Sequence, residues 1–201
     1  RYGRNKLALS QAPISHDVEI IKRVLGDYKP SIRKILEVGC GDGSKVLELS
    51  SYFQAKGSGV DPSASAVHDG NELDNGLELS VGIASDLPYD SDSFDFVYFG
   101  FCLYLIDRSE VFRAVAEADR VLKSGGFIAI LDFDPKQRHK RPYHHKPGLF
   151  SYKANYADYF TVGGHYCSVA KESFSHSGRS FVQDSDERIS ITVLYKEEDP
   201  Y

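Results

Sequence analysis

The chain has 201 residues, 41% of them hydrophobic and 12% aromatic, so it can bury one sizeable core and is expected to form one domain over residues 1–201. Its net charge of −5 disfavours a nucleic-acid-binding face, which needs a broad basic stripe. The sequence contains no apolar run long enough to span a membrane and no apolar signal core after the basic N-terminus. We therefore expect a soluble, cytoplasmic protein without a membrane partner.

Taken in chain order, apolar β-branched runs alternate with helical patterns. A first helix is predicted from Asp17 to about Leu25, and a second is expected to begin near Ser44. The runs that predict strands are Ile35–Val38, Ser58–Val60, Leu79–Ile83, Phe94–Phe99 and Phe127–Phe133. This alternation is typical of a parallel sheet with helices on both faces.

The clearest helix signal begins at Asp107, which forms with Glu110 a D-x-x-E version of the capping box. Apolar residues follow at helical spacing, at Val111, Val115, Ala118 and Leu122. The helix is expected to stop at Ser124-Gly125-Gly126, a glycine termination signal. Farther on, Arg188–Lys196 alternates like a strand and is predicted to form a hairpin with Ser168–Ser175.

The stretch ILEVGCGDGS, residues 35–44, places Gly39, Gly41 and Gly43 directly after the first predicted strand. The carboxyl ends of the strands in an open α/β sheet border the crevice where ligands bind. Glycine allows unusual dihedral angles and the close approach of a ligand, and free N–H groups at the start of the next helix favour negative charge. The turn is therefore predicted to lie against a cofactor.

Two acids indicate which cofactor fits. A dinucleotide fingerprint has its third glycine at position 44, where this chain has Ser44. Glu37, two residues before Gly39, suits an ammonium group better than a pyrophosphate. Asp61 lies 22 residues beyond Gly39, where an acid accepts hydrogen bonds from ribose hydroxyls. A ribose, an ammonium and a carboxylate occur together in S-adenosylmethionine.

Four blocks follow one another in this chain: ILEVGCGDGS, GVDPS, GIASDLPYDSDSFDFVYF and EADRVLKSGGFIAILDF. In these blocks the chain resembles the class I S-adenosylmethionine-dependent methyltransferases, in particular the methyltransferase type 11 group, over roughly residues 33–133. The resemblance implies a Rossmann-like α/β fold with a seven-stranded, mostly parallel sheet, helices on both faces and an antiparallel last strand. It also implies S-adenosylmethionine as the cofactor.

The resemblance assigns cofactor contacts residue by residue. Glu37 and the glycine loop would hold the methionine end, Asp61 the ribose hydroxyls, and Ala84 the adenine through its backbone. Many family members carry an acid where this chain has Ile83, and Asp86 could compensate. The predicted cofactor-binding residues are Glu37, Gly39, Cys40, Gly41, Gly43, Asp61, Pro62, Ile83, Ala84 and Asp86.

The chain is divided into four segments, of which one is the cofactor-binding core. Residues 1–32 are expected to form an N-terminal helical cap, 33–133 the cofactor-binding core, 134–166 a substrate lid and 167–201 the terminal hairpin. Residues 134–153 carry six bases, Arg138, Lys140 and Arg141 among them, against one acid, whereas the rest of the chain carries 18 bases and 28 acids. With the five tyrosines of the lid, these bases predict a small anionic substrate. The alternative is a solvated loop without a role.

Tyr104, His144 and His145 are the candidate catalytic residues. Tyr104 lies near the end of the fourth predicted strand, although an aromatic residue there could also pack in the core. A histidine could serve as the base that a hydroxyl acceptor needs. Residues 99–104 read FGFCLY and lack the Asn-Pro-Pro-Tyr type of segment that some family members use to methylate nucleobases or glutamine. Methylation at oxygen or carbon of a small anionic metabolite is therefore predicted.

No metal site is predicted. His144 and His145 lack a third ligand at a convincing spacing. The cysteines Cys40, Cys102 and Cys167 lie far apart, which favours reduced thiols over disulfides or a zinc site.

Two other functions stay open on the sequence alone. The chain could be a non-catalytic module that binds S-adenosylmethionine as a sensor or accessory subunit, since the same residues would support binding without turnover. A nicotinamide-dependent oxidoreductase on a similar sheet is disfavoured by Ser44 and Glu37.

Overall fold

The structure of the protein, a computed structural model, describes residues 15–73, 75–143 and 148–199. Its helices are α1 His16–Leu25, α2 Ser44–Phe53, α3 Ala64–Asn71, α4 Arg108–Val121 and α5 Asp158–Thr161, with short 3₁₀ helices at Gly26–Tyr28 and Leu103–Leu105. Its strands are β1 Lys34–Val38, β2 Lys56–Asp61, β3 Glu78–Val81, β4 Phe94–Gly100, β5 Leu122–Phe133, β6 His139–Pro142, β7 Phe150–Lys153, β8 Tyr166–Ser175 and β9 Arg188–Lys196. Each helix and strand predicted from the sequence is found, with small shifts at the boundaries.

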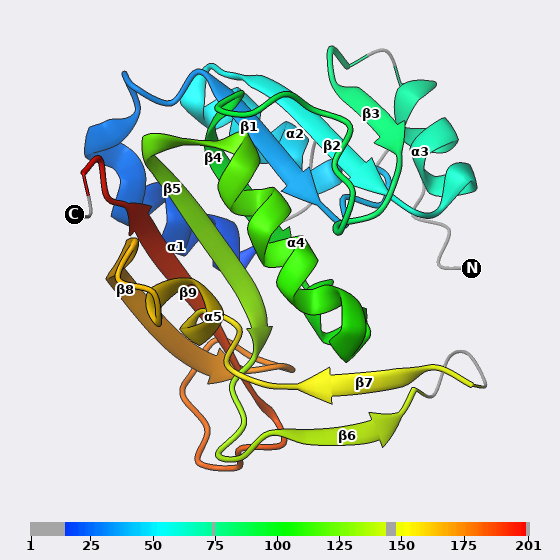
Figure 1. Ribbon diagram of the computed structural model, residues 1–201, viewed down its shortest axis with the longest axis vertical. Helices are drawn as coiled ribbons and strands as arrows, with labels where there is room; N and C mark the ends of the chain where they lie inside the picture. The colour runs from blue at the N-terminus through cyan, green and yellow to red at the C-terminus, as the bar shows by residue number, and fades with distance from the viewer. Residues whose placement is uncertain (1–14, 74, 144–147, 200–201) are drawn as a thin grey trace.

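Seven strands form one sheet in the order β3-β2-β1-β4-β5-β9-β8 (Figure 1). Strands β1 to β5 run parallel, whereas β9 is antiparallel to both of its neighbours, β5 and β8. The predicted fold class and the terminal hairpin are therefore confirmed. Because β1 lies between β2 and β4, the chain crosses over in opposite directions on its two sides, and the carboxyl end of β1 is a topological switch point.

Helices cover both faces of the sheet because the central parallel strands are apolar on both faces. Ile35 of β1 packs in the core cluster with α1 and α2, whereas its neighbour Leu36 packs in the cluster that includes α4. Figure 1 shows α4 and α5 in front of the sheet and α1 and α2 behind it. None of the helices in the described ranges is long and apolar enough to cross a membrane.

Helix α4 begins as expected but ends earlier. The Asp107 side chain caps it by accepting a hydrogen bond from the Ser109 N–H at 3.0 Å. Leu122 already has extended dihedral angles and pairs with β4, so the chain passes from α4 into β5 without a loop. The predicted stop at Ser124-Gly125-Gly126 is wrong. These residues lie inside β5, where Gly125 has a φ of 76° next to a shift in strand register.

The predicted lid, residues 134–166, divides into two parts. Strands β6 and β7 form a separate two-stranded antiparallel sheet that lies beyond the carboxyl end of β5 (Figure 1). Residues after β7 return to the main sheet, where Tyr156, Phe160 and Tyr166 are buried in the same cluster as α4. The β6–β7 hairpin thus forms a sheet of its own, although Ser151 and Lys153 of β7 are buried.

Helix α1 is also a core element. Val18 and Ile21 are fully buried in the cluster that α1 shares with α2 and the sheet. The rest of the predicted N-terminal cap, residues 1–14, lies outside the described residues. The described part of the cap thus packs against one face of the sheet as part of the core.

Candidate cofactor and acceptor sites

The glycine loop joins β1 to α2 at the switch point of the sheet. Gly39 and Gly43 each have a φ of 78°, in the left-handed region that favours glycine. A Cβ on Gly39 would lie 2.5 Å from the Cβ of Cys102, and one on Gly43 would lie 2.9 Å from side-chain carbons of Leu77 and Leu79. The packing of neighbouring segments therefore excludes side chains at both positions.

Asp61 ends β2 beside this loop. Its Oδ2 accepts a hydrogen bond from the Gly41 N–H at 2.9 Å, and its Oδ1 accepts one from the Ser63 N–H at 2.8 Å. The carboxylate thus fixes the glycine loop against the end of β2. Each carboxylate oxygen has a further lone pair, so these bonds leave capacity to accept hydrogen bonds from a ligand.

A cavity of about 430 Å³, here called the cofactor cavity, opens at the ends of β1 and β2. Five of the predicted cofactor residues line it, namely Gly39, Asp61, Pro62, Ile83 and Ala84. Residues after β4 and at the start of α4 also line it, namely Phe101, Cys102, Leu105, Ile106, Asp107 and Glu110. The sequence analysis did not assign these six to the cofactor.

One of these six residues, Phe101, has an unusual backbone conformation. It directly follows β4 and is a non-glycine residue with a φ of 55°. Such a left-handed conformation costs free energy in a bulky residue and is concentrated at functional sites. The dihedral angle itself has no sequence signature, so only the structure identifies Phe101.

The other predicted cofactor residues lie outside the cofactor cavity. Cys40 is buried with its sulfur beside Gly59, where an added Cβ would lie 2.6 Å from that sulfur, and burial raises the pKa of its thiol. Gly41 is held by Asp61, and Asp86 is exposed with its N–H donating to the carbonyl of Ile83 at 3.2 Å. In the described part of the chain, no group of three His, Cys, Asp or Glu side chains gathers as metal ligands.

Glu37 is buried beneath the glycine loop, with 3% of its surface exposed. Its Oε2 accepts a hydrogen bond from the Val46 N–H of α2 at 2.9 Å. Next to it, the carboxylate of Asp17 from α1 pairs with Lys45 at 2.5 Å and accepts a hydrogen bond from the Tyr98 hydroxyl. Glu37 thus anchors the start of α2, and its predicted contact with an ammonium group stays a prediction. The Asp17–Lys45–Tyr98 network was missed because its members lie far apart in the sequence.

We expect the protein to lose stability as the pH rises towards 8. Burial raises the pKa of both Glu37 and Asp132 to about 8, from ordinary values of 4.5 and 3.8. The folded state therefore holds these protons more tightly than the unfolded chain. Their contribution to stability is complete below about pH 4 and is lost as the pH rises through about 8. Thermal unfolding from pH 5 to 9 should show a falling Tm, with a shallower fall in Glu37→Gln. A pH slope in Glu37→Gln and in Asp132→Asn as steep as that of the parent protein would contradict this assignment.

Tyr104 lies just after β4 in an aromatic cluster with Phe101, Phe133 and Tyr143. Its backbone N–H donates to Oδ2 of Asp132 at 3.2 Å, and burial raises the pKa of its hydroxyl. Tyr104 lines neither the cofactor cavity nor the second cavity described below. Its catalytic role stays a prediction, and the other two candidates, His144 and His145, lie outside the described residues.

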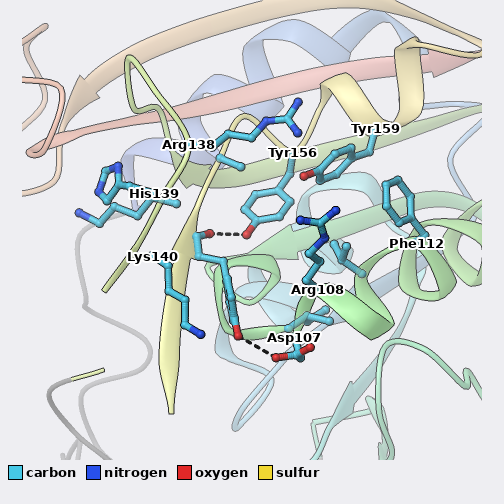
Figure 2. Close-up of a pocket in the computed structure, with 13 residues that line it drawn as sticks. Asp107, Arg108, Phe112, Arg138, His139, Lys140, Tyr156 and Tyr159 are labelled. Atoms are coloured by element: carbon cyan, nitrogen blue, oxygen red, sulfur yellow. Dashed lines mark hydrogen bonds between the residues drawn. The ribbon is translucent and has the colours of Figure 1, made fainter. Parts of the chain in front are cut away.

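A second cavity of about 580 Å³, here called the basic cavity, lies between the start of α4 and the β6–β7 hairpin (Figure 2). Ile106 and Asp107 line both cavities, so the two adjoin at the start of α4. The lining of the basic cavity combines basic and aromatic side chains, namely Arg108, Arg138, His139, Lys140, Lys153, Phe112, Tyr152, Tyr156 and Tyr159. Arg108 and Phe112 were missed because they belong to α4 rather than to the predicted lid.

A hydrogen bond ties the hairpin to α4. The Tyr152 hydroxyl of β7 donates to Oδ2 of Asp107 at 2.7 Å, as Figure 2 shows. The Ser109 N–H and the Tyr152 hydroxyl lower the pKa of Asp107 to about 2, so its carboxylate stays ionised near neutral pH. The basic cavity therefore contains one fixed negative charge at the boundary with the cofactor cavity.

Aromatic rings hold two of the bases of the hairpin. The guanidinium carbon of Arg138 lies 5.4 Å from the centre of the Tyr159 ring, and Nζ of Lys140 lies 3.7 Å from the centre of the Phe150 ring. Arg141, which the sequence placed with them, instead pairs with Asp186 at 2.6 Å and does not line the cavity. Of the three bases, Arg138 and Lys140 thus line the basic cavity and Arg141 does not.

Comparison with known proteins places the chain in a family. The model of a family described as a methyltransferase domain matches residues 36–130. A demethylmenaquinone methyltransferase of Staphylococcus aureus is 33% identical over 147 residues, which cover 69% of this chain and 55% of that protein. Ajmaline N-methyltransferase of Rauvolfia serpentina is 32% identical over 127 residues, which cover 58% of this chain and 43% of that protein. The chain spans about half the length of these curated relatives.

Solved structures share the fold. An S-adenosylmethionine-dependent methyltransferase of Methanosarcina mazei has a TM-score of 0.72 at 17% identity, covering 88% of this chain and 98% of that one. The 1,6-didemethyltoxoflavin-N1-methyltransferase of Burkholderia thailandensis, with bound 1,6-didemethyltoxoflavin and S-adenosylhomocysteine, has a TM-score of 0.66 at 14% identity, covering 96% and 81%. Residues 36–130 thus match the methyltransferase domain family, and the chain shares its fold with S-adenosylmethionine-dependent methyltransferases of known structure.

Proposed function

We propose that the protein transfers a methyl group from S-adenosylmethionine to a small anionic molecule, at an oxygen or carbon atom. The observation that carries this proposal is the junction of the two cavities at Ile106 and Asp107. A cofactor in one cavity and an acceptor in the other would approach each other at this junction. Close and aligned reactants supply much of the catalysis in a displacement at carbon.

The residues of the cofactor cavity match the parts of S-adenosylmethionine. The Asp61 carboxylate suits the two ribose hydroxyls. The bare backbone at Gly39 allows the methionine end to approach β1, and the apolar side chains of Ile83 and Leu105, both exposed at the cavity, suit the faces of an adenine ring. When bound, S-adenosylmethionine supplies a methyl group on a positively charged sulfur.

The charge of the basic cavity supports an anionic acceptor. Its lining includes Arg108, Arg138, Lys140 and Lys153 against the single carboxylate of Asp107. Arginine forks bind carboxylate or phosphate in two-point contacts, and the tyrosine rings supply flat apolar area for the rest of the molecule. We further propose that the β6–β7 hairpin serves as the substrate lid within a single domain.

The acceptor atom decides whether the chain must also take up a proton. A hydroxyl acceptor loses its proton as the new bond to the methyl carbon forms, and the electrons of the broken bond stay on the cofactor sulfur. His139 lines the basic cavity and could accept that proton near neutral pH, whereas an acidic carbon acceptor could react as its anion. The catalytic roles predicted from the sequence for Tyr104, His144 and His145 are kept as part of this proposal.

We expect the double variant Arg138→Ala, Lys140→Ala to raise the KM for an anionic acceptor about ten-fold or more, on the scale of lost charge-assisted hydrogen bonds. Cofactor affinity should be unchanged because neither residue lines the cofactor cavity. The measurement is transfer of tritium from labelled S-adenosylmethionine to small hydroxy acids and phosphate monoesters, each paired with its uncharged ester.

Arg141→Ala is the matched control for this double variant. It removes a base from the same strand but outside the basic cavity, so it should leave the KM of charged acceptors unchanged. Equal kinetics in the double variant and the parent protein would exclude the basic cavity as the acceptor site. Binding of S-adenosylmethionine without transfer to any member of the panel would favour the non-catalytic alternative.

A further inference from the structure

Ile83 follows β3 and lines the part of the cofactor cavity proposed to hold adenine, and its apolar side chain is 53% exposed. Asp86, the nearest acid in sequence, is exposed and does not line the cavity. An acceptor for the exocyclic amine of adenine must therefore come from another segment.

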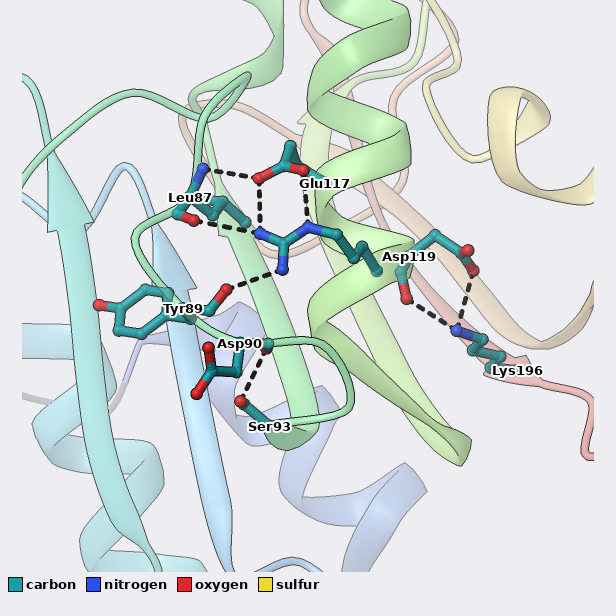
Figure 3. A network of polar contacts seen from close by, with 8 residues as sticks. Leu87, Tyr89, Asp90, Ser93, Glu117, Asp119 and Lys196 are labelled. Carbon is teal, nitrogen blue, oxygen red and sulfur yellow. Dashed lines mark hydrogen bonds and ion pairs between the residues drawn. The ribbon is translucent and has the colours of Figure 1, made fainter.

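Helix α4 is fixed against the loop that carries Ile83. The Leu87 N–H donates to Oε2 of Glu117 at 2.8 Å, and Arg120 donates to the carbonyls of Leu87 and Tyr89 at 3.1 and 2.8 Å. Figure 3 shows this clamp between α4 and the loop. The loop and the helix therefore keep one relative position at Leu87 and Tyr89.

Glu110 lies on the face of α4 that meets this loop. It precedes Glu117 by seven residues, close to two helical turns, so the two side chains share a face. The clamp holds Glu117 at Leu87, and Glu110 lies nearer the helix start, where it lines the cofactor cavity together with Ile83 and Ala84.

Glu110 is also the acid at the cofactor cavity whose side chain accepts no hydrogen bond from the described residues. Asp107, the N-cap residue of α4, accepts bonds from Ser109 and Tyr152, and Asp61 accepts bonds from Gly41 and Ser63. The capping box expected from the sequence would return the Glu110 side chain to the Asp107 N–H, but no hydrogen bond joins the Glu110 side chain to any of the described residues. Its place in the first helical turn stabilises a negative charge.

We propose that the Glu110 carboxylate accepts a hydrogen bond from the exocyclic amine of adenine and selects adenine against a base with a carbonyl at that position. This inference rests on the proposed use of the cofactor cavity by S-adenosylmethionine. The amine donates, whereas the carbonyl of hypoxanthine would face the carboxylate as a second acceptor and leave both without a partner.

The test is calorimetric titration with S-adenosylhomocysteine and S-inosylhomocysteine, which differ at this position of the base. The parent protein should bind the adenine compound at least about ten-fold more tightly. In Glu110→Gln the ratio of the two affinities should fall towards one, because the amide can turn its NH₂ group to the carbonyl of hypoxanthine. Asp86→Asn is the matched control for loss of a carboxylate near the loop, and its ratio should equal that of the parent.

The outcomes separate this inference from the proposed function. A ratio that stays unchanged in Glu110→Gln, or that falls in Asp86→Asn instead, overturns the role of Glu110 while the cofactor assignment stands. Failure of the parent protein to bind either compound overturns the use of the cavity itself. A uniform loss of both affinities in Glu110→Gln would mean that Glu110 supports the cavity without selecting the base, and it also contradicts the inference.

Discussion

Asp17→Ala is expected to lower the free energy of unfolding by about 3 kcal/mol, the lower end of the range for breaking a buried ion pair. Asp17 is 4% exposed, while the side chain of Lys45 keeps 32% exposure, so part of the lost interaction is replaced by water. Burial alone would raise the pKa of Asp17, but Lys45 and the hydrogen bonds from Ser15 and Tyr98 together lower it. The loss should appear in urea unfolding near pH 7.

The control for this variant is Glu172→Ala. It removes the ion pair with Arg23, which also belongs to α1 but whose side chains are 65% and 41% exposed, and such pairs contribute about 1 kcal/mol or less. If Asp17→Ala costs no more than Glu172→Ala, the Asp17–Lys45–Tyr98 network does not hold α1 against α2. Glu172 itself lies in β8, so the control removes an ion pair of α1 without changing the sequence of that helix.

Asp61→Ala is expected to weaken S-adenosylmethionine binding by about 1–3 kcal/mol, because the ribose hydroxyls would lose a charged acceptor in a partly enclosed cavity. The same change frees the N–H groups of Gly41 and Ser63, so the glycine loop should also lose order and Tm should fall. Asp61→Asn keeps an acceptor oxygen and should lose less affinity than Asp61→Ala.

Asp69→Ala provides the control, since Asp69 is an exposed residue of α3 that does not line the cofactor cavity. It should bind S-adenosylmethionine as the parent does. Parent-like affinity in Asp61→Ala would remove Asp61 from the ribose site. If Asp61→Ala binds S-adenosylmethionine more weakly but keeps the Tm of the parent, Asp61 contributes through its contact with the ligand and does not order the glycine loop.

The parts of the fold that are encoded locally could be predicted from the sequence. The apolar β-branched runs gave β1 to β5, and the alternation of Arg188–Lys196 gave β9, because strand patterning is visible in a few consecutive residues. The glycine loop and Asp61 were also predicted, since both depend on short motifs. In the structure the Gly41 N–H donates a hydrogen bond to Asp61, so the two motifs lie side by side.

The parts that depend on contacts between distant segments could not be predicted. Ser124-Gly125-Gly126 has the composition of a helix stop, yet pairing with β4 extends β5 back to Leu122 and ends the helix first. Segment 134–166 has the charge of a surface loop, but Tyr156 and Phe160 are core residues. The basic cavity needs α4 and the hairpin together, so no single stretch of sequence predicts it.

The measurement that tests the central claim most directly is parallel calorimetric titration of the protein with S-adenosylmethionine, S-adenosylhomocysteine and NADH. The account predicts micromolar binding of the first two and no binding of NADH, since the cavity ends at the glycine loop and Asp61 without a dinucleotide fingerprint. Binding of NADH alone would contradict the assignment of the cofactor cavity and the function built on it.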